Sequence, residues 1–245
     1  MTRDIKLISF DLDNTLWDVE PVIHTAEALT QTWLEEFCPK LFIRFTKEQL
    51  QQARLEYWRN HPELRHLITR VRRDSLRIKL IEAGYCLHQA IELADMAMEV
   101  FLEARHRVTY FDDALSTLNQ LAPRFTLAAI SNGNASPRRL GLGQFSYHLS
   151  AEQVGAAKPS PEPFELAMAM ASVCPGQMIH VGDCPKDDIA AAANLGIKTI
   201  WFNRHHASWP RVELQPDAIV HRLCELPAAI DQLAQAGPKL QAQSA

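Results

Sequence analysis

Residues 5–16 read Ile-Lys-Leu-Ile-Ser-Phe-Asp-Leu-Asp-Asn-Thr-Leu, an apolar run that ends in two aspartates, Asp11 and Asp13. Such a run predicts a buried strand, and open α/β sheets bind ligands outside the carboxyl ends of their strands. Two carboxylates this close repel each other unless a cation or a shared proton intervenes. A hard ion such as Mg²⁺, held by carboxylates and substrate phosphate, would remove that conflict. The same residues also suit a turn or a helix N-cap, so this stretch alone leaves a structural role open.

Three further segments, residues 126–131, 178–182 and 198–202, are apolar enough to be strands buried on both faces. They alternate with helical segments, which predicts a doubly wound, Rossmann-like α/β fold with a parallel sheet. Right-handed crossovers, combined with the strand order of a known family that the chain resembles, place the first strand centrally, between the strands at 126–131 and 178–182. The residues that follow these three strands are therefore expected to converge at one edge of the sheet.

Between residues 18 and 107 the sequence has helical periodicity throughout and contains no convincing strand. We expect this span to form a small helical domain inserted into the α/β core, which would comprise residues 1–17 and 108–235. Residues 236–245, Ala-Gly-Pro-Lys-Leu-Gln-Ala-Gln-Ser-Ala, are predicted to be a disordered tail.

Composition places the chain among ordinary globular proteins, since 47% of its 245 residues are hydrophobic and 22% are charged. A net charge of −4 argues against a broad basic surface for nucleic acid. The five cysteines include no Cys-x-x-Cys pair, and there is no signal-peptide pattern. No apolar run approaches the roughly 18 residues of a membrane span. We therefore expect a cytoplasmic monomer or weak homodimer that binds neither membranes nor nucleic acids.

The opening stretch, Phe10-Asp-Leu-Asp-Asn-Thr-Leu16, resembles the first motif of the haloacid dehalogenase superfamily, most of whose members are phosphatases. Three further segments resemble the remaining motifs of that family and occur in the family's order. They are residues 127–133 (Leu-Ala-Ala-Ile-Ser-Asn-Gly), residues 158–161 (Lys-Pro-Ser-Pro), and residues 179–183 (Ile-His-Val-Gly-Asp) followed by Asp188. The chain is thereby identified as a member of this superfamily, and its helical insertion resembles the family's type 1 cap.

This resemblance implies catalysis through an aspartyl-phosphate. Asp11 would be the nucleophile, and Asp13 would protonate the leaving oxygen and then activate water. Ser131 and the backbone N–H groups of Asn132 and Gly133 would hold a phosphoryl oxygen, while Lys158 would neutralise the charge on the others.

The resemblance also implies a metal cofactor, Mg²⁺. Its ligands would be the carboxylates of Asp11 and Asp183 and the backbone carbonyl of Asp13. Asp188 would not bind the metal directly; it would either orient the waters of the metal or hold Lys158 in place.

A magnesium-dependent phosphomonoesterase for a small phosphate ester is the leading function. A dehalogenase of the same superfamily needs the nucleophile but no metal, and both Asp13 and the acidic fourth motif argue against it. A non-catalytic binding protein on this scaffold would be expected to lack one of the motif residues, and none is missing. A mutase differs from a phosphatase mainly in how water reaches the phospho-aspartate. The sequence does not show this difference, so a mutase stays an open alternative.

The whole chain resembles most a bacterial branch described as flavin mononucleotide and riboflavin-precursor phosphatases. Its Ser/Thr-Asn-Gly-Asn motif is found here at residues 131–134, and its cap segment resembles Thr69-Arg70-Val71-Arg72, although Leu67-Ile68 departs from the branch. The implied substrates are flavin mononucleotide or 5-amino-6-(5-phosphoribitylamino)uracil, with sugar phosphates and nucleoside monophosphates as alternatives. Arg70 and Arg72 are the candidate specificity residues, and Trp17 can either stack on a flavin or pack between core and cap.

Overall fold

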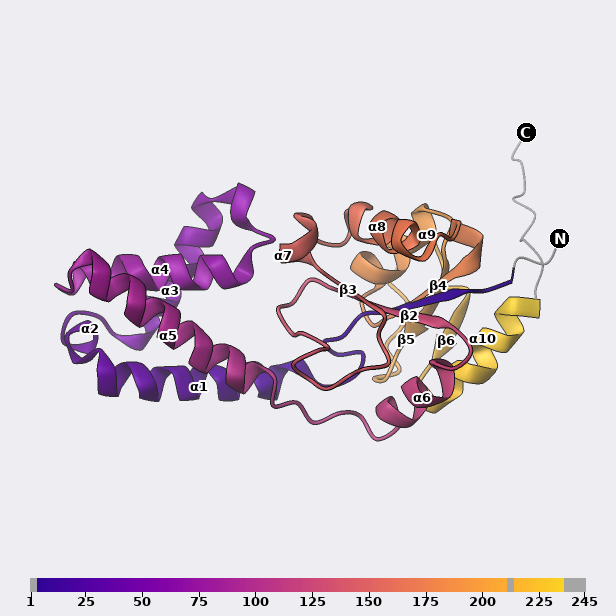
Figure 1. The fold of residues 1–245 in the computed structure, drawn as a ribbon, viewed down its shortest axis with the longest axis horizontal. Coiled ribbons are helices and arrows are strands. Elements are labelled where there is room, and N and C mark those ends of the chain that lie inside the picture. Colours follow the sequence, from indigo (N-terminus) through magenta and orange to yellow (C-terminus); the bar gives the residue numbers. More distant parts are fainter. Residues whose placement is uncertain (1–3, 211–213, 236–245) are drawn as a thin grey trace.

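The computed structural model describes residues 4–210 and 214–235, and it contains a six-stranded, entirely parallel sheet beside a bundle of helices (Figure 1). The strand order is β3-β2-β1-β4-β5-β6, so β1 lies centrally between β2 and β4, as predicted. The strands are β1 (Leu7–Phe10), β2 (Thr126–Ser131), β3 (Tyr147–Ser150), β4 (Met178–Gly182), β5 (Lys198–Phe202) and β6 (Ala218–Val220). The predicted doubly wound α/β core is confirmed.

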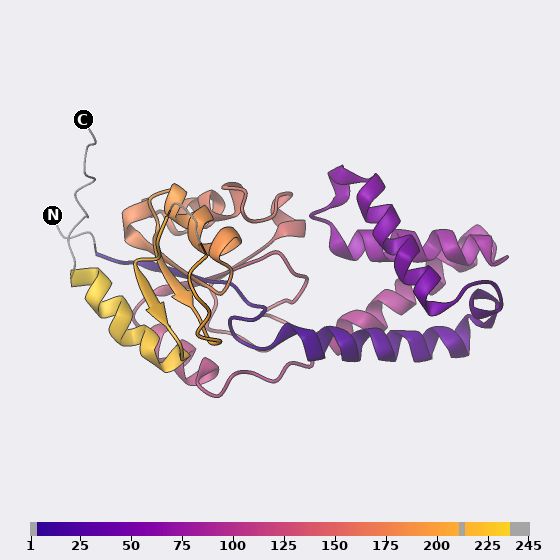
Figure 2. The same cartoon turned by 180° about the vertical axis from the view of Figure 1, so that it is seen from behind.

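Helices cover both faces of this sheet, as Figure 1 and the view from behind in Figure 2 show. Successive residues of β1 point to opposite faces, and all four are buried. Ile8 and Phe10 pack toward α6 and α10, whereas Leu7 packs toward α8 and α9. These helices are α6 (Ala114–Leu121), α8 (Glu162–Ala171), α9 (Ala191–Asn194) and α10 (Leu226–Gln235), with the short α7 (Ala151–Val154) following β3.

The two edge strands, β3 and β6, were not predicted from the sequence. An edge strand need not be buried on both faces, so its sequence lacks the continuous apolar run that marks the central strands. Tyr147 and His148 in β3 are only half-buried, and Ile219 in β6 is 46% exposed. The sheet is therefore two strands wider than the sequence pattern indicated.

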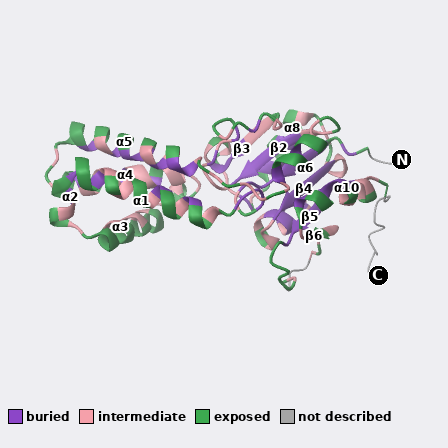
Figure 3. Ribbon diagram, turned by 90° about the horizontal axis from the view of Figure 1, so that it is seen from below, coloured by how far each residue is buried: buried purple, intermediate pink, exposed green. Residues whose placement is uncertain are grey.

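The span between β1 and α6 is helical, as predicted from its periodicity. Its helices are α1 (Val19–Phe37), α2 (Pro39–Arg44), α3 (Lys47–Asn60), α4 (Ile68–Glu82) and α5 (Leu87–Arg105). Helix α5 packs against α1 and α4, around an apolar cluster that includes Leu34, Leu41 and Leu80. Figure 3 shows buried strands in the core and exposed outer faces on these helices.

We propose that this bundle is a separate cap domain within residues 18–107, inserted between residues 1–17 and 108–235 of the core. It has an apolar cluster of its own, distinct from the two clusters on the faces of the sheet. The expected tail, residues 236–245, lies outside the described residues.

Local signals in the sequence set several helix ends of this bundle. Thr46 and Gln49 form the capping box that begins α3, each side chain accepting a hydrogen bond from the other's backbone N–H. Gly84 adopts a φ of +93° just after α4, a conformation that side chains disfavour. The six-residue α2, which begins at Pro39, was not predicted because it is too short to show periodicity.

The five cysteines are free thiols and form no disulfide. Within the described ranges, no helix combines the length and the apolar character needed to cross a membrane.

Candidate active site

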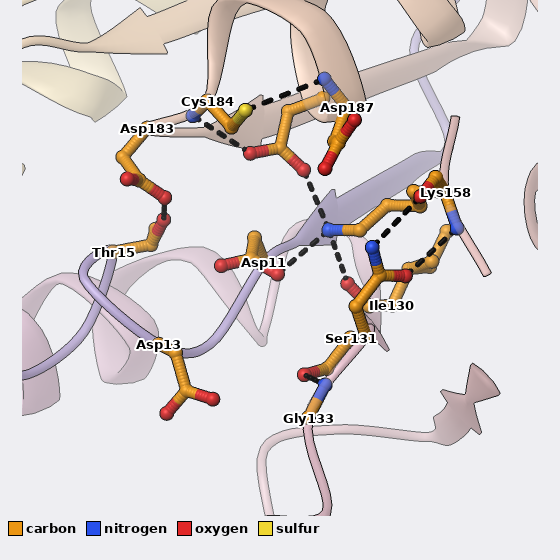
Figure 4. A network of polar contacts seen from close by, with 12 residues as sticks. Asp11, Asp13, Thr15, Ile130, Ser131, Gly133, Lys158, Asp183, Cys184 and Asp187 are labelled. Carbon is orange, nitrogen blue, oxygen red and sulfur yellow. Dashed lines mark hydrogen bonds and ion pairs between the residues drawn. The ribbon is translucent and has the colours of Figure 1, made fainter. Parts of the chain in front are cut away.

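The carboxyl ends of three neighbouring strands carry the polar residues singled out in the sequence. Asp11 follows β1 directly, Ser131 is the last residue of β2, and Asp183 follows β4. Because β1 pairs in parallel with both β2 and β4, these side chains lie together at one edge of the sheet (Figure 4). Carboxylate oxygens of Asp11, Asp183 and Asp188 lie within 4.8 Å of one another.

Lys158 joins this cluster through a buried ammonium group, with only 4% of the residue exposed. Its Nζ donates to Asp11 Oδ1 at 2.6 Å, to Asp188 Oδ1 at 2.5 Å and to the carbonyl oxygen of Ile130 at 2.9 Å. An ammonium has three donors, so this set satisfies all of them. Burial alone would lower the pKa of Lys158, but the Asp11 and Asp188 carboxylates raise it above its ordinary value.

Asn132 holds the backbone of Lys158 from the neighbouring loop. The Lys158 N–H donates to Asn132 Oδ1 at 2.7 Å, and Asn132 Nδ2 donates to the Lys158 carbonyl at 2.8 Å. The Asn132 side chain therefore positions the lysine. Its expected contact with phosphate rests on its backbone N–H instead.

Asp188 lies on the helical turn η3 (Pro185–Ala190) and is fixed by several donors besides Lys158. The Cys184 N–H donates to Oδ2 at 2.9 Å, and His180 Nε2 lies 3.2 Å from Oδ1. Burial alone would raise the pKa of Asp188, but Lys158 and His180 lower it below its ordinary value. Of the two roles expected for Asp188, the structure shows the contact with Lys158.

His180 is a fully buried core histidine of β4, and both of its ring nitrogens lie within hydrogen-bond distance of a partner. Burial lowers its pKa, which favours the neutral ring. A carboxylate only accepts, so Nε2 donates to Asp188 and Nδ1 accepts from the Ser9 hydroxyl at 2.6 Å. Ser9, His180, Asp188 and Lys158 thus form one buried chain of hydrogen bonds.

The carboxylates of Asp11 and Asp183 fit a hard divalent cation. Burial raises the pKa of Asp183 to about 6 and that of Asp11 well above its ordinary value, and the Asp188 carboxylate adds to both shifts. Both oxygens of Asp188 already accept hydrogen bonds, which leaves Asp11 and Asp183 as the better-placed ligands. A cation between two destabilised carboxylates would relieve their repulsion, and an all-oxygen donor set suits Mg²⁺.

The Asp13 carboxylate points away from this cluster (Figure 4) and has partners of its own. Arg105 Nη2 lies 2.6 Å from both of its oxygens, and Trp17 Nε1 donates to Oδ1 at 2.9 Å. The carboxylate also lies against Gly133, where an added Cβ would be 2.4 Å from Asp13 Oδ2 and 3.3 Å from Ser131 Oγ. Gly133 therefore allows Asp13 to approach the backbone that follows Ser131.

Arg105 was missed in the sequence. An arginine in the last turn of a helix ordinarily interacts with the helix dipole at the surface, so its position carries no signal of burial. Its pairing with Asp13 spans 92 residues of sequence and became visible only in the fold.

The two arginines expected to contact substrate lie in different surroundings. Arg72 lines a cavity of about 320 Å³ between cap helices, and its guanidinium lies 3.8 Å from the centre of the Phe101 ring. Arg70 does not line this cavity; its side chain is 53% exposed and pairs with Asp74 at 3.3 Å. Trp17 is fully buried and packs edge-on against Tyr110, so of its two expected roles the packing one is observed.

The chain is similar to known hydrolases along most of its length. The model of the haloacid dehalogenase-like hydrolase family matches residues 5–196. The 5-amino-6-(5-phospho-D-ribitylamino)uracil phosphatase YigB of Escherichia coli K12 is 33% identical over 231 residues, which cover 92% of this chain and 96% of that protein. A phosphoserine phosphatase of Thermus thermophilus is 33% identical over 135 residues, about half of each chain (52% and 53%).

A solved structure that is named for a different activity is also similar to this chain. It is the 2-haloacid dehalogenase of Pseudomonas syringae pv. tomato DC3000, with a TM-score of 0.89 and 43% identity. The match covers 93% of this chain and 99% of that one. The relatives described here are therefore named as phosphatases in two cases and as a dehalogenase in the third.

Gly182 tests whether Asp188 must hold Lys158. An alanine at position 182 would place its Cβ 2.3 Å from Asp188 Cγ, so the carboxylate would have to move off Lys158. We expect Gly182→Ala to lower kcat/KM for p-nitrophenyl phosphate by at least about 100-fold, the usual cost of losing a preorganised charge contact. Circular dichroism checks that the variant is folded. Gly143→Ala is the control, because its Cβ would meet nothing within 4 Å, and full activity of Gly182→Ala would contradict the role of Asp188.

Proposed function

The chain belongs to the haloacid dehalogenase-like hydrolase family, and on this premise we propose that it is a magnesium-dependent phosphomonoesterase acting through an aspartyl-phosphate. One observation carries the proposal. The buried Lys158 ammonium contacts the carboxylate of Asp11 at 2.6 Å, while an oxygen of Asp183 lies within 4.8 Å of that carboxylate. A nucleophile, a fixed positive charge and a second carboxylate for a cation thus share one buried site.

In the first step, an oxygen of Asp11 attacks phosphorus and the bond to the leaving oxygen breaks. Asp13 gives its proton to that leaving oxygen, which departs as an alcohol. Lys158 and the backbone N–H groups after Ser131 stabilise the charge on the phosphoryl oxygens.

In the second step, a water gives a proton to Asp13 and its oxygen attacks phosphorus. The bond between phosphorus and Asp11 breaks, phosphate leaves and the Asp11 carboxylate is restored. Asp13 ends the cycle protonated and ready for the next leaving group.

Magnesium, when bound by Asp11, Asp183 and the backbone carbonyl of Asp13, would offset the repulsion between the attacking carboxylate and the phosphoryl group. Asp188 is assigned no direct ligand role, because its oxygens hold Lys158 and the Cys184 N–H.

A 2-haloacid dehalogenase is the second candidate, because the similar structure with 43% identity carries that name. Halide displacement at carbon leaves no phosphoryl charge for a cation to balance and requires no proton for the leaving halide. Asp13 would then have no leaving group to protonate and Asp183 no cation to hold, yet one is ion-paired at the site and the other completes the carboxylate cluster. These two residues favour the phosphatase.

The proposed substrate is 5-amino-6-(5-phosphoribitylamino)uracil or flavin mononucleotide. Similarity to YigB along nearly the whole chain supports this choice, since that relative is named as a phosphatase of the ribitylaminouracil phosphate. The cavity of about 320 Å³ supports it too, because aromatic and apolar side chains such as Trp58 and Phe101 line it together with Arg72. Asn134 also lines the cavity and follows Gly133 directly in the loop expected to hold phosphate. Such walls suit a planar heterocycle at the far end of a phosphate ester.

The remaining proposals concern the setting of the enzyme. We assign it to the cytoplasm as a monomer or weak homodimer whose partner is a small-molecule phosphate ester. The free thiols support the assignment to the cytoplasm.

Metal removal tests the cofactor. We expect EDTA to lower the hydrolysis of p-nitrophenyl phosphate at least about 100-fold, because the site then lacks the charge that brings two anions together. Added Mg²⁺ should restore the rate, and circular dichroism with EDTA present should show an intact fold. Hydrolysis at the full rate by metal-free enzyme would contradict the proposal.

A phosphate-release screen over a panel of phosphorylated metabolites tests the substrate, with 2-chloropropionate included to detect halide release. We expect the ribitylaminouracil phosphate or flavin mononucleotide to give the highest kcat/KM. If the kcat/KM of a sugar phosphate or nucleoside monophosphate exceeds that of both compounds by tenfold, about 1.4 kcal/mol of transition-state preference, the proposed substrate is wrong. The proposed phosphatase activity would still stand. Halide release without phosphate release would contradict the phosphatase itself.

A further inference from the structure

Arg105 is a buried arginine at the end of a cap helix, and it binds a residue of the proposed active site. It is the last residue of α5, and only 1% of it is exposed. One nitrogen, Nη2, bridges both carboxylate oxygens of Asp13 at 2.6 Å. Bonds of this kind between an ionised donor and a carboxylate are short, strong and directional.

The pair lies where the cap joins the core. Asp13 is on the connection from β1 to α1, and Arg105 is the last residue of α5, directly before the connection from α5 to α6. The two connections are also joined by a backbone bridge between Trp17 and Tyr110, whose rings pack edge-on with centroids 5.9 Å apart. The cap therefore reaches the proposed acid/base residue through a short, partly buried contact.

This contact fixes how the Asp13 carboxylate faces the phosphate site. Arg105 and Trp17 Nε1 bind it from one side, and the Gly133 backbone lies against Oδ2. The same glycine N–H donates to Ser131 Oγ at 3.0 Å, so the carboxylate is aligned with the loop expected to hold phosphate.

Arg105 contributes less to stability than its burial suggests. Its Nε and Nη1 are buried and donate to no group in the described part of the chain. Buried donors without partners cost stability and call for a reason other than packing. A contact that orients a reacting carboxylate supplies such a reason.

We propose that Arg105 is a positioning residue for Asp13, holding its carboxylate in the orientation that accepts the water proton in the second step. The proposal rests on the proposed function. In that step the water oxygen bonds to phosphorus, the bond from phosphorus to Asp11 breaks and the proton passes to Asp13. The first step on p-nitrophenyl phosphate differs, because p-nitrophenolate leaves without needing a proton; Asp13 loses its proton to solvent instead and enters the second step as a carboxylate. Loss of Arg105 should therefore slow the second step selectively.

Stopped-flow hydrolysis of p-nitrophenyl phosphate by the magnesium-loaded enzyme separates the two steps. The readout is the ratio of the first-turnover rate of nitrophenol release to the steady-state kcat. We expect Arg105→Ala to raise this ratio at least about tenfold over the unaltered enzyme, since first-turnover release persists while kcat falls. Arg105→Lys keeps a positive charge and should recover part of the loss. Arg107→Ala is the matched control, because that neighbouring arginine is 62% exposed and pairs with Glu103 outside the site.

A purely structural arginine would lower both rates together and leave the ratio unchanged, which would overturn the proposal. If Arg105→Ala does not fold, the Arg105→Lys variant decides. A raised ratio in that variant would support the proposal, and an unchanged ratio would overturn it. Failure of the unaltered enzyme to form a phospho-enzyme would overturn the proposed function and this inference with it. A phospho-enzyme with an unmoved ratio in the variants would overturn this inference alone.

Discussion

The buried ion pair between Lys158 and Asp11 is the contact on which the rest of the site depends. An ammonium withdrawn from water is costly unless every donor is paired, and Lys158 achieves this with Asp11, Asp188 and the Ile130 carbonyl. Removing one partner of such a buried pair typically costs about 3–5 kcal/mol, because the other charge is left uncompensated. The arrangement therefore fixes the proposed nucleophile, the positive charge proposed to neutralise phosphate and the loop before α8 relative to one another.

Parallel strand pairing makes this contact possible, and a second layer of buried residues maintains it. The partners of Lys158 come from β1, from β2 and from the turn after β4, which only the sheet brings together. Behind them, His180 donates to Asp188 and accepts from Ser9. Gly182 leaves room for Asp188 to approach the strand. The cap contributes Arg105, so both parts of the chain help to shape the polar site.

The sequence predicted the features that depend on local pattern. Central strands such as β1 and β4 have continuous apolar runs, and motif residues such as Asp11 and Asp183 stand at their ends. Edge strands β3 and β6 escaped detection because they are short and partly exposed. Pairings between distant residues, such as that of Arg105 with Asp13, leave no trace in one sequence. Helical periodicity likewise did not separate Arg72, which lines a cavity, from Arg70, which pairs with Asp74.

The most direct test of the central claim is to trap the phosphorylated nucleophile. Enzyme quenched during turnover of p-nitrophenyl phosphate is reduced with borohydride, which converts an aspartyl-phosphate to homoserine, and its peptides are analysed by mass spectrometry. If Asp11 is the nucleophile, we predict homoserine at position 11 of the unaltered enzyme. We predict no homoserine at that position in an Asp11→Asn variant that is treated in the same way. Modification of a different residue, or an unmodified Asp11 in enzyme that is turning over, would contradict this role of Asp11.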